Sequence, residues 1–120
     1  MSTAELGRWA EEVATQALAA YDYRVICRNW RSTHGEIDIV AREAGMWVFV
    51  EVKARTGVGR GLPEEAVTAS KQVRLIELAR AYLAAQGIED TAWRIDVLAL
   101  ELTADRKVRR LTIHRDAVRD

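Results

Sequence analysis

The chain has 120 residues with 18 basic and 18 acidic side chains, so its formal net charge is zero, and 49% of its residues are apolar. This length and composition are typical of one globular domain and exclude a disordered chain. The single cysteine excludes an intrachain disulfide and a cysteine-only metal cluster, and the two separated histidines make a zinc site a poor fit. No apolar run approaches the ~20 residues that span a bilayer, so we expect a cytoplasmic protein with no membrane partner.

The charge balance argues against a protein that binds nucleic acid over its whole surface, since non-specific affinity depends on positive charge. A net charge of zero is still compatible with a locally basic cleft beside acidic groups. Arginine is the usual cation of the chain, with 15 copies against only three lysines, Lys53, Lys71 and Lys107. Each lysine is therefore of interest, because lysine transfers protons and arginine essentially does not.

The N-terminal half predicts one helix followed by three strands. Ser2 and Glu5 fit a capping box, and apolar residues then recur at helical spacing, which predicts a helix over residues 3–20. The residue pattern predicts strands over 24–30, 36–42 and 46–55, and the Ala44-Gly45 pair is a turn signal between the last two.

The C-terminal half predicts a second helix and two further strands. Pro63 fits the first position of a helix over 63–86, and Gly87 fits its left-handed stop. Strands are expected over 93–102 and 108–114. The order α-β-β-β-α-β-β indicates an α/β fold with one central sheet and helices packed on it, as a single domain over residues 1–120.

The hairpin around Ala44-Gly45 carries the most informative charges. If it is antiparallel and centred on that turn, Asp38 lies opposite Glu51 and Glu36 lies opposite Lys53. Glu51 and Lys53 also share a face, because strand side chains alternate. Two carboxylates and an ammonium group are therefore predicted to lie together on a strand whose valines and Phe49 indicate burial.

This combination points to a metal site. Opposed carboxylates repel, and buried charge is costly unless it is paired or bound to a metal. Mg²⁺ prefers carboxylate oxygens, Asp38 and Glu51 fit that preference, and Lys53 would orient or deprotonate a water. The alternative is a solvent-facing sheet surface with ordinary cross-strand salt bridges.

Two helical charges extend the apolar stripes of their helices. Glu11 lines up with Ala14 and Leu18 on the buried side, so it is expected either to join a metal site or to reach solvent at the stripe's edge. Lys71 precedes Leu75 and Leu78 at helical spacing, so it either contacts a phosphate or snorkels to water.

Other charges receive weaker assignments. Arg55 follows the site strand, Arg60 lies in a glycine-rich loop, and Arg31 lies in a basic aromatic segment, so all three are candidate nucleic-acid contacts. Asp96 is expected to be structural, pairing with Arg94 or capping a helix.

The arrangement Asp38…Glu51-Val52-Lys53 resembles the signature of PD-(D/E)xK nucleases. Around it, four longer motifs resemble the YraN family of small bacterial proteins: Gly7-x-x-Ala10-Glu11-x-x-Ala14, Arg28-Asn29-Trp30-Arg31, Gly35-Glu36-Ile37-Asp38-Ile39-Val40-Ala41 and Val48-Phe49-Val50-Glu51-Val52-Lys53-Ala54-Arg55. The resemblance covers about residues 7–115, essentially the whole chain.

The resemblance implies a restriction-endonuclease-like core similar to archaeal Holliday-junction resolvases. It implies Glu11, Asp38 and Glu51 as ligands of Mg²⁺ or Mn²⁺, with Lys53 as the catalytic lysine. Glu36 matches a residue typical of the YraN family and is expected to support the site. A homodimer is implied as well, since junction-cleaving enzymes of this type tend to act in pairs.

The function expected from the sequence is therefore a metal-dependent endonuclease that hydrolyses phosphodiesters in DNA, with branched or damaged DNA as candidate substrates. The alternative is a nucleic-acid-binding or adaptor module on a nuclease scaffold that needs a partner for activity, and neutral net charge favours it. A structural or interaction protein, whose charges form only salt bridges, would bind no Mg²⁺ or Mn²⁺ specifically.

Overall fold

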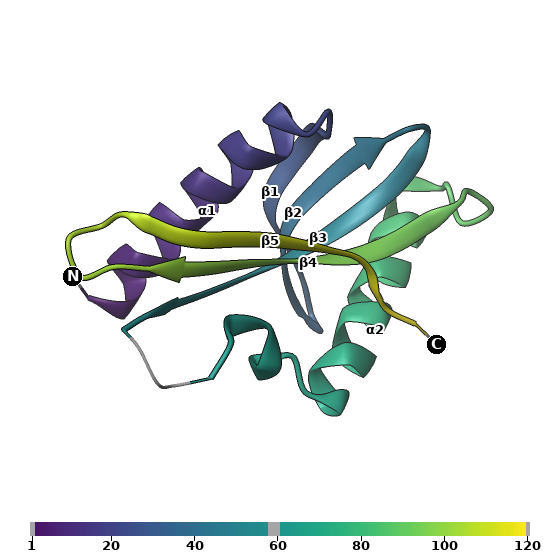
Figure 1. The fold of residues 1–120 in the computed structure, drawn as a ribbon. Helices are drawn as coiled ribbons and strands as arrows, with labels where there is room; N and C mark the ends of the chain where they lie inside the picture. The colour runs from purple at the N-terminus through teal and green to yellow at the C-terminus, as the bar shows by residue number, and fades with distance from the viewer. Residues whose placement is uncertain (1, 58–60, 120) are drawn as a thin grey trace.

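A single five-stranded sheet with one long helix on each face forms the body of the molecule (Figure 1). The computed structural model describes residues 2–57 and 61–119. The elements in chain order are α1 (Thr3–Ala20), β1 (Arg24–Ser32), β2 (Gly35–Glu43), β3 (Met46–Thr56), the 3₁₀ turn η1 (Pro63–Ala66), α2 (Ala69–Gln86), β4 (Trp93–Leu102) and β5 (Val108–Val118). The predicted restriction-endonuclease-like order and mixed sheet are confirmed.

The sheet follows the chain order β1-β2-β3-β4-β5, and only its β3–β4 pair is parallel. That pair needs a crossover, which η1 and α2 supply. The β2–β3 turn at Ala44 and Gly45 has φ of 51° and 80°, as a two-residue hairpin turn with both central residues left-handed requires. The turn therefore fixes the register on which the site depends.

Two hydrophobic clusters, one on each face of the sheet, make up the core. On one face, α1 packs Ala10, Ala14 and Leu18 against strand residues that include Val48 and Val50. On the other face, the cluster joins residues of α2 to Phe49 of β3, and its helical members are Leu75, Ile76, Leu78, Ala79, Tyr82 and Leu83. Alternation along β3 thus sends successive side chains to opposite helices.

The second helix begins later than the sequence pattern predicts. Residues Pro63–Ala66 form only a 3₁₀ turn, and Val67 leaves the helical region with ψ of 82°. The side chain of Thr68 then accepts a hydrogen bond from the Lys71 amide and caps α2. The predicted stop at Gly87 is confirmed, with φ of 69°.

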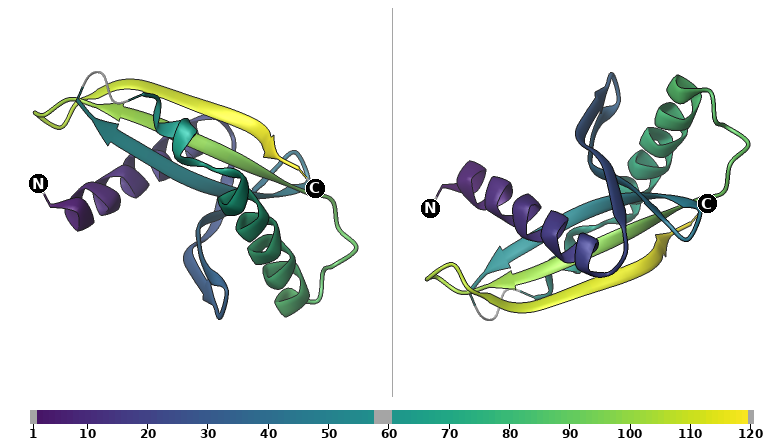
Figure 2. Two further views of the ribbon diagram at one scale, coloured as in Figure 1. Left: turned by 90° about the horizontal axis from the view of Figure 1, so that it is seen from below. Right: turned by 90° about the horizontal axis from the view of Figure 1, so that it is seen from above.

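The β1–β2 hairpin extends beyond the ladder that joins β2 to β3. Its own ladder reaches Ser32–Gly35, whereas the β2–β3 ladder reaches only Ile39–Val50. Figure 2 shows this hairpin leaving the sheet and running beside α2. The two strands β2 and β3 therefore separate at Asp38, inside the molecule rather than at its edge.

A buried ion network is centred on Asp96 of β4, which pairs with Val50 of β3. Asp96 is fully buried and accepts hydrogen bonds from Tyr23 Oη at 2.7 Å, Arg94 Nε at 2.9 Å and the Asp116 amide at 2.9 Å. Arg94 also donates to Glu43 at 2.9 Å. The predicted structural role of Asp96 and its pairing with Arg94 are confirmed.

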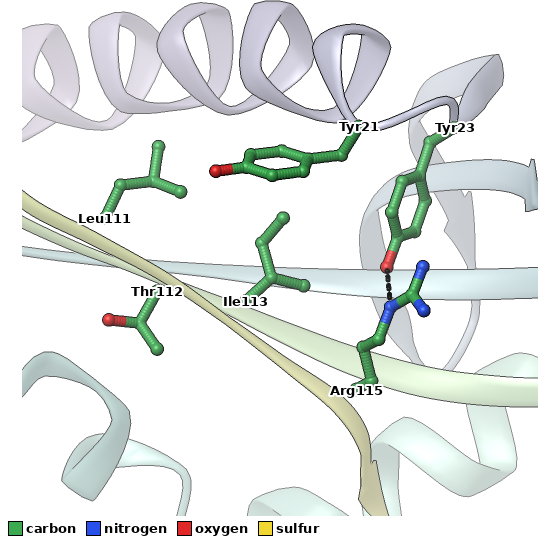
Figure 3. Close-up of a pocket in the computed structure, with 6 residues that line it drawn as sticks. All are labelled: Tyr21, Tyr23, Leu111, Thr112, Ile113 and Arg115. Atoms are coloured by element: carbon green, nitrogen blue, oxygen red, sulfur yellow. Dashed lines mark hydrogen bonds between the residues drawn. The ribbon is translucent and has the colours of Figure 1, made fainter.

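A hollow of about 460 Å³ between the end of α1 and β5 lies next to this network (Figure 3). Tyr21, Leu111 and Ile113 supply apolar walls, and Arg115 donates to the Tyr23 hydroxyl at 3.3 Å. None of its six lining residues is a carboxylate, a cysteine or a lysine, so it lacks the groups that the sequence singled out. Within the described part of the chain, neither helix is long and apolar enough to cross a membrane.

Candidate metal-dependent active site

The side chain of Asp38 occupies the point where β2 and β3 separate. Ladder pairs from Glu43–Met46 to Ile39–Val50 confirm the predicted hairpin register. Beyond the last pair, Ile39–Val50, the Val52 amide donates a hydrogen bond to a side chain and not to the backbone of β2. The acceptor is Asp38 Oδ2, at 2.8 Å. The carboxylate is thus held at the strand junction and not on an open sheet surface.

Glu11 approaches the same point from α1. It is half-buried, as its place beside the apolar stripe predicts, whereas its neighbour Glu12 is exposed and pairs with Arg28 at 3.0 Å. Its Oε1 atom is buried and has no hydrogen-bond partner among the described residues. An unsatisfied buried carboxylate oxygen is costly, and a cation would remove that cost.

Glu36 completes a group of three carboxylates. Glu11, Glu36 and Asp38 each place one oxygen so that all three oxygens lie within 4.8 Å of one another. Glu36 is also held from outside by Arg31, its partner across the β1–β2 ladder, at 3.2 Å. The sequence expected Glu36 only as support, yet in the structure it joins Glu11 and Asp38 in the group that could share one ion.

Glu51 lies beside this group and is hydrogen-bonded to Asp38. Burial, this hydrogen bond and the charge of Glu51 together raise the pKa of Asp38 to about 8, although the Val52 amide and Lys53 act against the shift. Burial and the charge of Asp38 also raise the pKa of Glu11. Asp38 therefore holds a proton at neutral pH for which a divalent cation can substitute.

Lys53 links two cavities on either side of the junction. A cavity of about 260 Å³ on the α1 side is lined by Lys53 together with Glu11 and Asp38. A second cavity of about 200 Å³ on the α2 side is lined by Lys53 together with Glu36 and Glu51. The alternation of strand side chains predicted that Glu36, Asp38, Glu51 and Lys53 share one face. Because the strands separate here, the carboxylates divide between two cavities, and among the described residues only Lys53 lines both.

The candidate nucleic-acid contacts differ in their positions. Lys71 is exposed and lines the α2-side cavity, and Arg31 reaches the site through Glu36. Arg55 is half-buried near the end of β3, opposite Glu101 of β4, and lines neither cavity. Arg60 lies outside the described residues.

Sequence reasoning missed Arg74, which lines the α2-side cavity next to Lys71. The two residues are three positions apart on α2, a spacing that places side chains on one helical face. That spacing is the signal in the sequence that points to Arg74.

The donor set fits a hard divalent cation. Mg²⁺ and Mn²⁺ are bound by carboxylate oxygens, and Glu11, Glu36 and Asp38 offer three at one point with one oxygen unsatisfied. Among the described residues, no histidine or cysteine joins this group. Soft-metal chemistry is therefore a poor match for it.

The raised pKa of Asp38 predicts that the metal-free protein loses stability as pH rises. An unfolded aspartate titrates near ~3.9, so between about pH 4 and 8 the native state binds more protons than the unfolded state. The free energy of unfolding in EDTA should then fall steadily across that window. Glu43, whose pKa is lowered by its hydrogen bond from Arg94, acts in the opposite direction only at lower pH.

Urea unfolding followed by tryptophan fluorescence at several pH values measures this slope. Asp38→Asn should remove most of it. A free energy of unfolding that rises from pH 5 to pH 8 would contradict the assignment.

Comparison with known proteins gives one consistent match. The model of the uncharacterised protein family UPF0102 matches residues 10–100, a span that includes Glu11, Glu36, Asp38, Glu51 and Lys53. The chain is similar to a UPF0102 protein of Roseiflexus castenholzii, with 48% identity over 81% of this chain and 79% of the relative. It is similar also to UPF0102 proteins of Symbiobacterium thermophilum (47% identity, 87% of this chain and 88% of the relative) and Mycolicibacterium smegmatis (45%, 88% and 87%).

Proposed function

This chain belongs to the UPF0102 family, the YraN family indicated by its motifs, and from the site that it carries we propose that it is a metal-dependent endonuclease that hydrolyses phosphodiesters in DNA. The observation that supports the proposal is the convergence of Glu11, Glu36 and Asp38 at one strand junction, with Lys53 beside them. A structural protein gains nothing from this arrangement, because it leaves a buried carboxylate oxygen unpaired.

In this proposal, each side chain has a separate task. Glu11, Glu36 and Asp38 would hold Mg²⁺ or Mn²⁺, and the neighbouring Glu51 carboxylate would add to the negative potential that attracts the ion. When bound, the ion supplies Lewis acidity that draws electron density from the phosphodiester. The Val52 amide fixes the Asp38 carboxylate, so the ligand set is preorganised by the backbone of β3.

Lys53 would act on the attacking water and on the phosphate. Lys53 lines both cavities, so a substrate that crosses the junction would pass beside it. A positive group at this position orients a water by hydrogen bonding and stabilises the negative charge that develops in the transition state.

The test is cleavage of labelled branched, flapped and single-stranded DNA by wild type and Lys53→Met in Mn²⁺. We expect the wild type to cleave and Lys53→Met to lose about 10²–10⁴-fold in rate while still binding the ion. Lys107→Met is the matched control, because Lys107 is 77% exposed in the β4–β5 turn and its loss should leave the rate unchanged. Equal rates for Lys53→Met and wild type would contradict the proposal.

The same samples test the adaptor alternative. DNA binding that persists in EDTA, with no cleavage under Mg²⁺ or Mn²⁺, would favour a module that needs a partner. The net charge of zero is the observation on which that alternative depends.

A further inference from the structure

The cavity on the α2 side of the junction has the features of an anion site. It is enclosed by three elements: the tip of the β1–β2 hairpin, β3 and the first half of α2. Three cationic side chains line it, and they are Lys53, Lys71 and Arg74. Its volume of about 200 Å³ admits a small group such as a phosphate and excludes a bulky ligand.

The two carboxylates that also line the cavity are engaged elsewhere. Glu36 pairs with Arg31 at 3.2 Å and belongs to the acidic group, and Glu51 is hydrogen-bonded to Asp38. In residues 2–57 and 61–119, the side chains of Lys71 and Arg74 form no ion pair or hydrogen bond. The cavity is therefore lined by three cationic and two acidic side chains, and the charges of Lys71 and Arg74 are not paired with any described residue.

The tip of the β1–β2 hairpin lies near Arg74 at the cavity. A Cβ atom added at Gly35 would meet Arg74 Cδ at 3.9 Å and Leu78 Cδ1 at 3.7 Å, so the hairpin backbone lies against the arginine stem. Gly35 has φ of 134°, a conformation that favours glycine. The hairpin tip, which runs beside α2 (Figure 2), thus lies near the stem of the exposed Arg74.

Lys71 and Arg74 are separated by one helical turn near the N-terminal end of α2, which begins at Ala69. Like charges at this spacing repel each other. An anion bound between them would attract both and so offset the repulsion. The helix dipole adds positive potential at this end of an 18-residue helix.

We propose that this cavity binds a backbone phosphate of the DNA strand next to the one that is cleaved, with Arg74 and Lys71 as its binding residues. The proposal rests on the proposed function, because Lys53 joins this cavity to the carboxylate group. A strand anchored at α2 would then place its neighbouring phosphate at the junction of β2 and β3. The local cations also explain how a chain with no net charge would hold a polyanion.

The test measures binding without cleavage. A labelled single-stranded oligonucleotide is titrated in EDTA at several salt concentrations, and its anisotropy gives the affinity. The double variant Lys71→Gln with Arg74→Gln keeps the side-chain stems and removes two charges. We expect weaker binding and a salt dependence that is lower by about 0.7 per lost phosphate contact.

Arg80→Gln is the matched control, since Arg80 is an exposed arginine further along the same helix and does not line this cavity. It should bind the oligonucleotide with the wild-type salt dependence. Thermal unfolding of all variants checks that the fold is intact.

The outcomes separate the two proposals. If the wild type cleaves in Mn²⁺ but the double variant binds DNA as the wild type does, the phosphate site is wrong and the nuclease stands. If the wild type neither binds nor cleaves DNA, both are wrong. If inorganic phosphate binds at this cavity but does not compete with the oligonucleotide, the site takes free phosphate and the strand assignment is wrong.

Discussion

Asp38→Asn is expected to lower the rate of cleavage strongly and, at the same time, to make the metal-free protein more stable. An asparagine oxygen can still accept the Val52 amide, and its NH₂ group can donate to Glu51, so the local geometry is kept. What is lost is the negative charge that a cation requires. Loss of that ligand should lower the cleavage rate by about 10³-fold, which corresponds to roughly 4 kcal/mol.

The gain in stability follows from the raised pKa of Asp38. In EDTA at pH 8, removal of a buried charge that repels Glu51 should increase the free energy of unfolding by about 1–3 kcal/mol. Urea titration measures the stability, and Mn²⁺-dependent DNA cleavage measures the activity. Asp90→Asn, at an exposed aspartate, is the control that should change neither quantity. Cleavage by Asp38→Asn at the wild-type rate would contradict the account.

Asp96→Asn should produce the largest loss of stability and leave the metal ligands in place. The Asp96 carboxylate accepts hydrogen bonds from Tyr23, Arg94 and the Asp116 amide with no exposed surface. In an asparagine at this position, one carboxylate oxygen is replaced by an NH₂ group, which cannot accept the hydrogen bonds that these donors make. The charge of Arg94 would also lose its buried partner. Breaking one member of a buried pair costs about 3–5 kcal/mol.

Urea unfolding measures that loss, and Asp105→Asn in the exposed β4–β5 turn is the control, which should cost far less. We expect the Asp96 variant to keep its Mn²⁺ affinity at low temperature, because Tyr23, Arg94 and Asp96 line neither of the two cavities at the junction. A destabilisation of less than ~1 kcal/mol would show that the network is not a main support of the fold.

The register of the β2–β3 hairpin was predictable because a two-residue turn determines the pairing of every residue that follows. Ala44-Gly45 places Ile39 opposite Val50, and the structure has this pair. Helical periodicity likewise placed Glu11 on the buried side of α1. These are local rules, and they position two of the three residues of the carboxylate group.

The place of Glu36 depends on a feature that those rules do not contain. The prediction from strand alternation assumes that β2 and β3 stay paired along their whole length. In the structure, the residues of β2 that precede Ile39 pair with β1 but not with β3, and Glu36 is among them. Glu36 then pairs with Arg31 and meets Glu11 instead of facing Lys53 across a ladder. Only the three-dimensional path of the hairpin, set by its packing beside α2, brings that carboxylate to the site.

The late start of α2 has a similar origin. Pro63 and the two glutamates that follow it form a good N-terminal signal, yet the structure uses them for a 3₁₀ turn. In that turn, Glu64 contacts His114 of β5 at 2.8 Å. A tertiary contact with β5 therefore accompanies the departure from the expected helix, and the true cap is Thr68.

The central claim is that the carboxylates at the β2–β3 junction bind a divalent ion for phosphodiester cleavage. Calorimetric titration of Mn²⁺ into metal-free wild type and Asp38→Asn at pH 8, followed by addition of labelled DNA to the same samples, tests it most directly. We predict saturable binding and cleavage by the wild type, with both lost in the variant. The same Mn²⁺ affinity in both proteins, or no binding by the wild type, would contradict it.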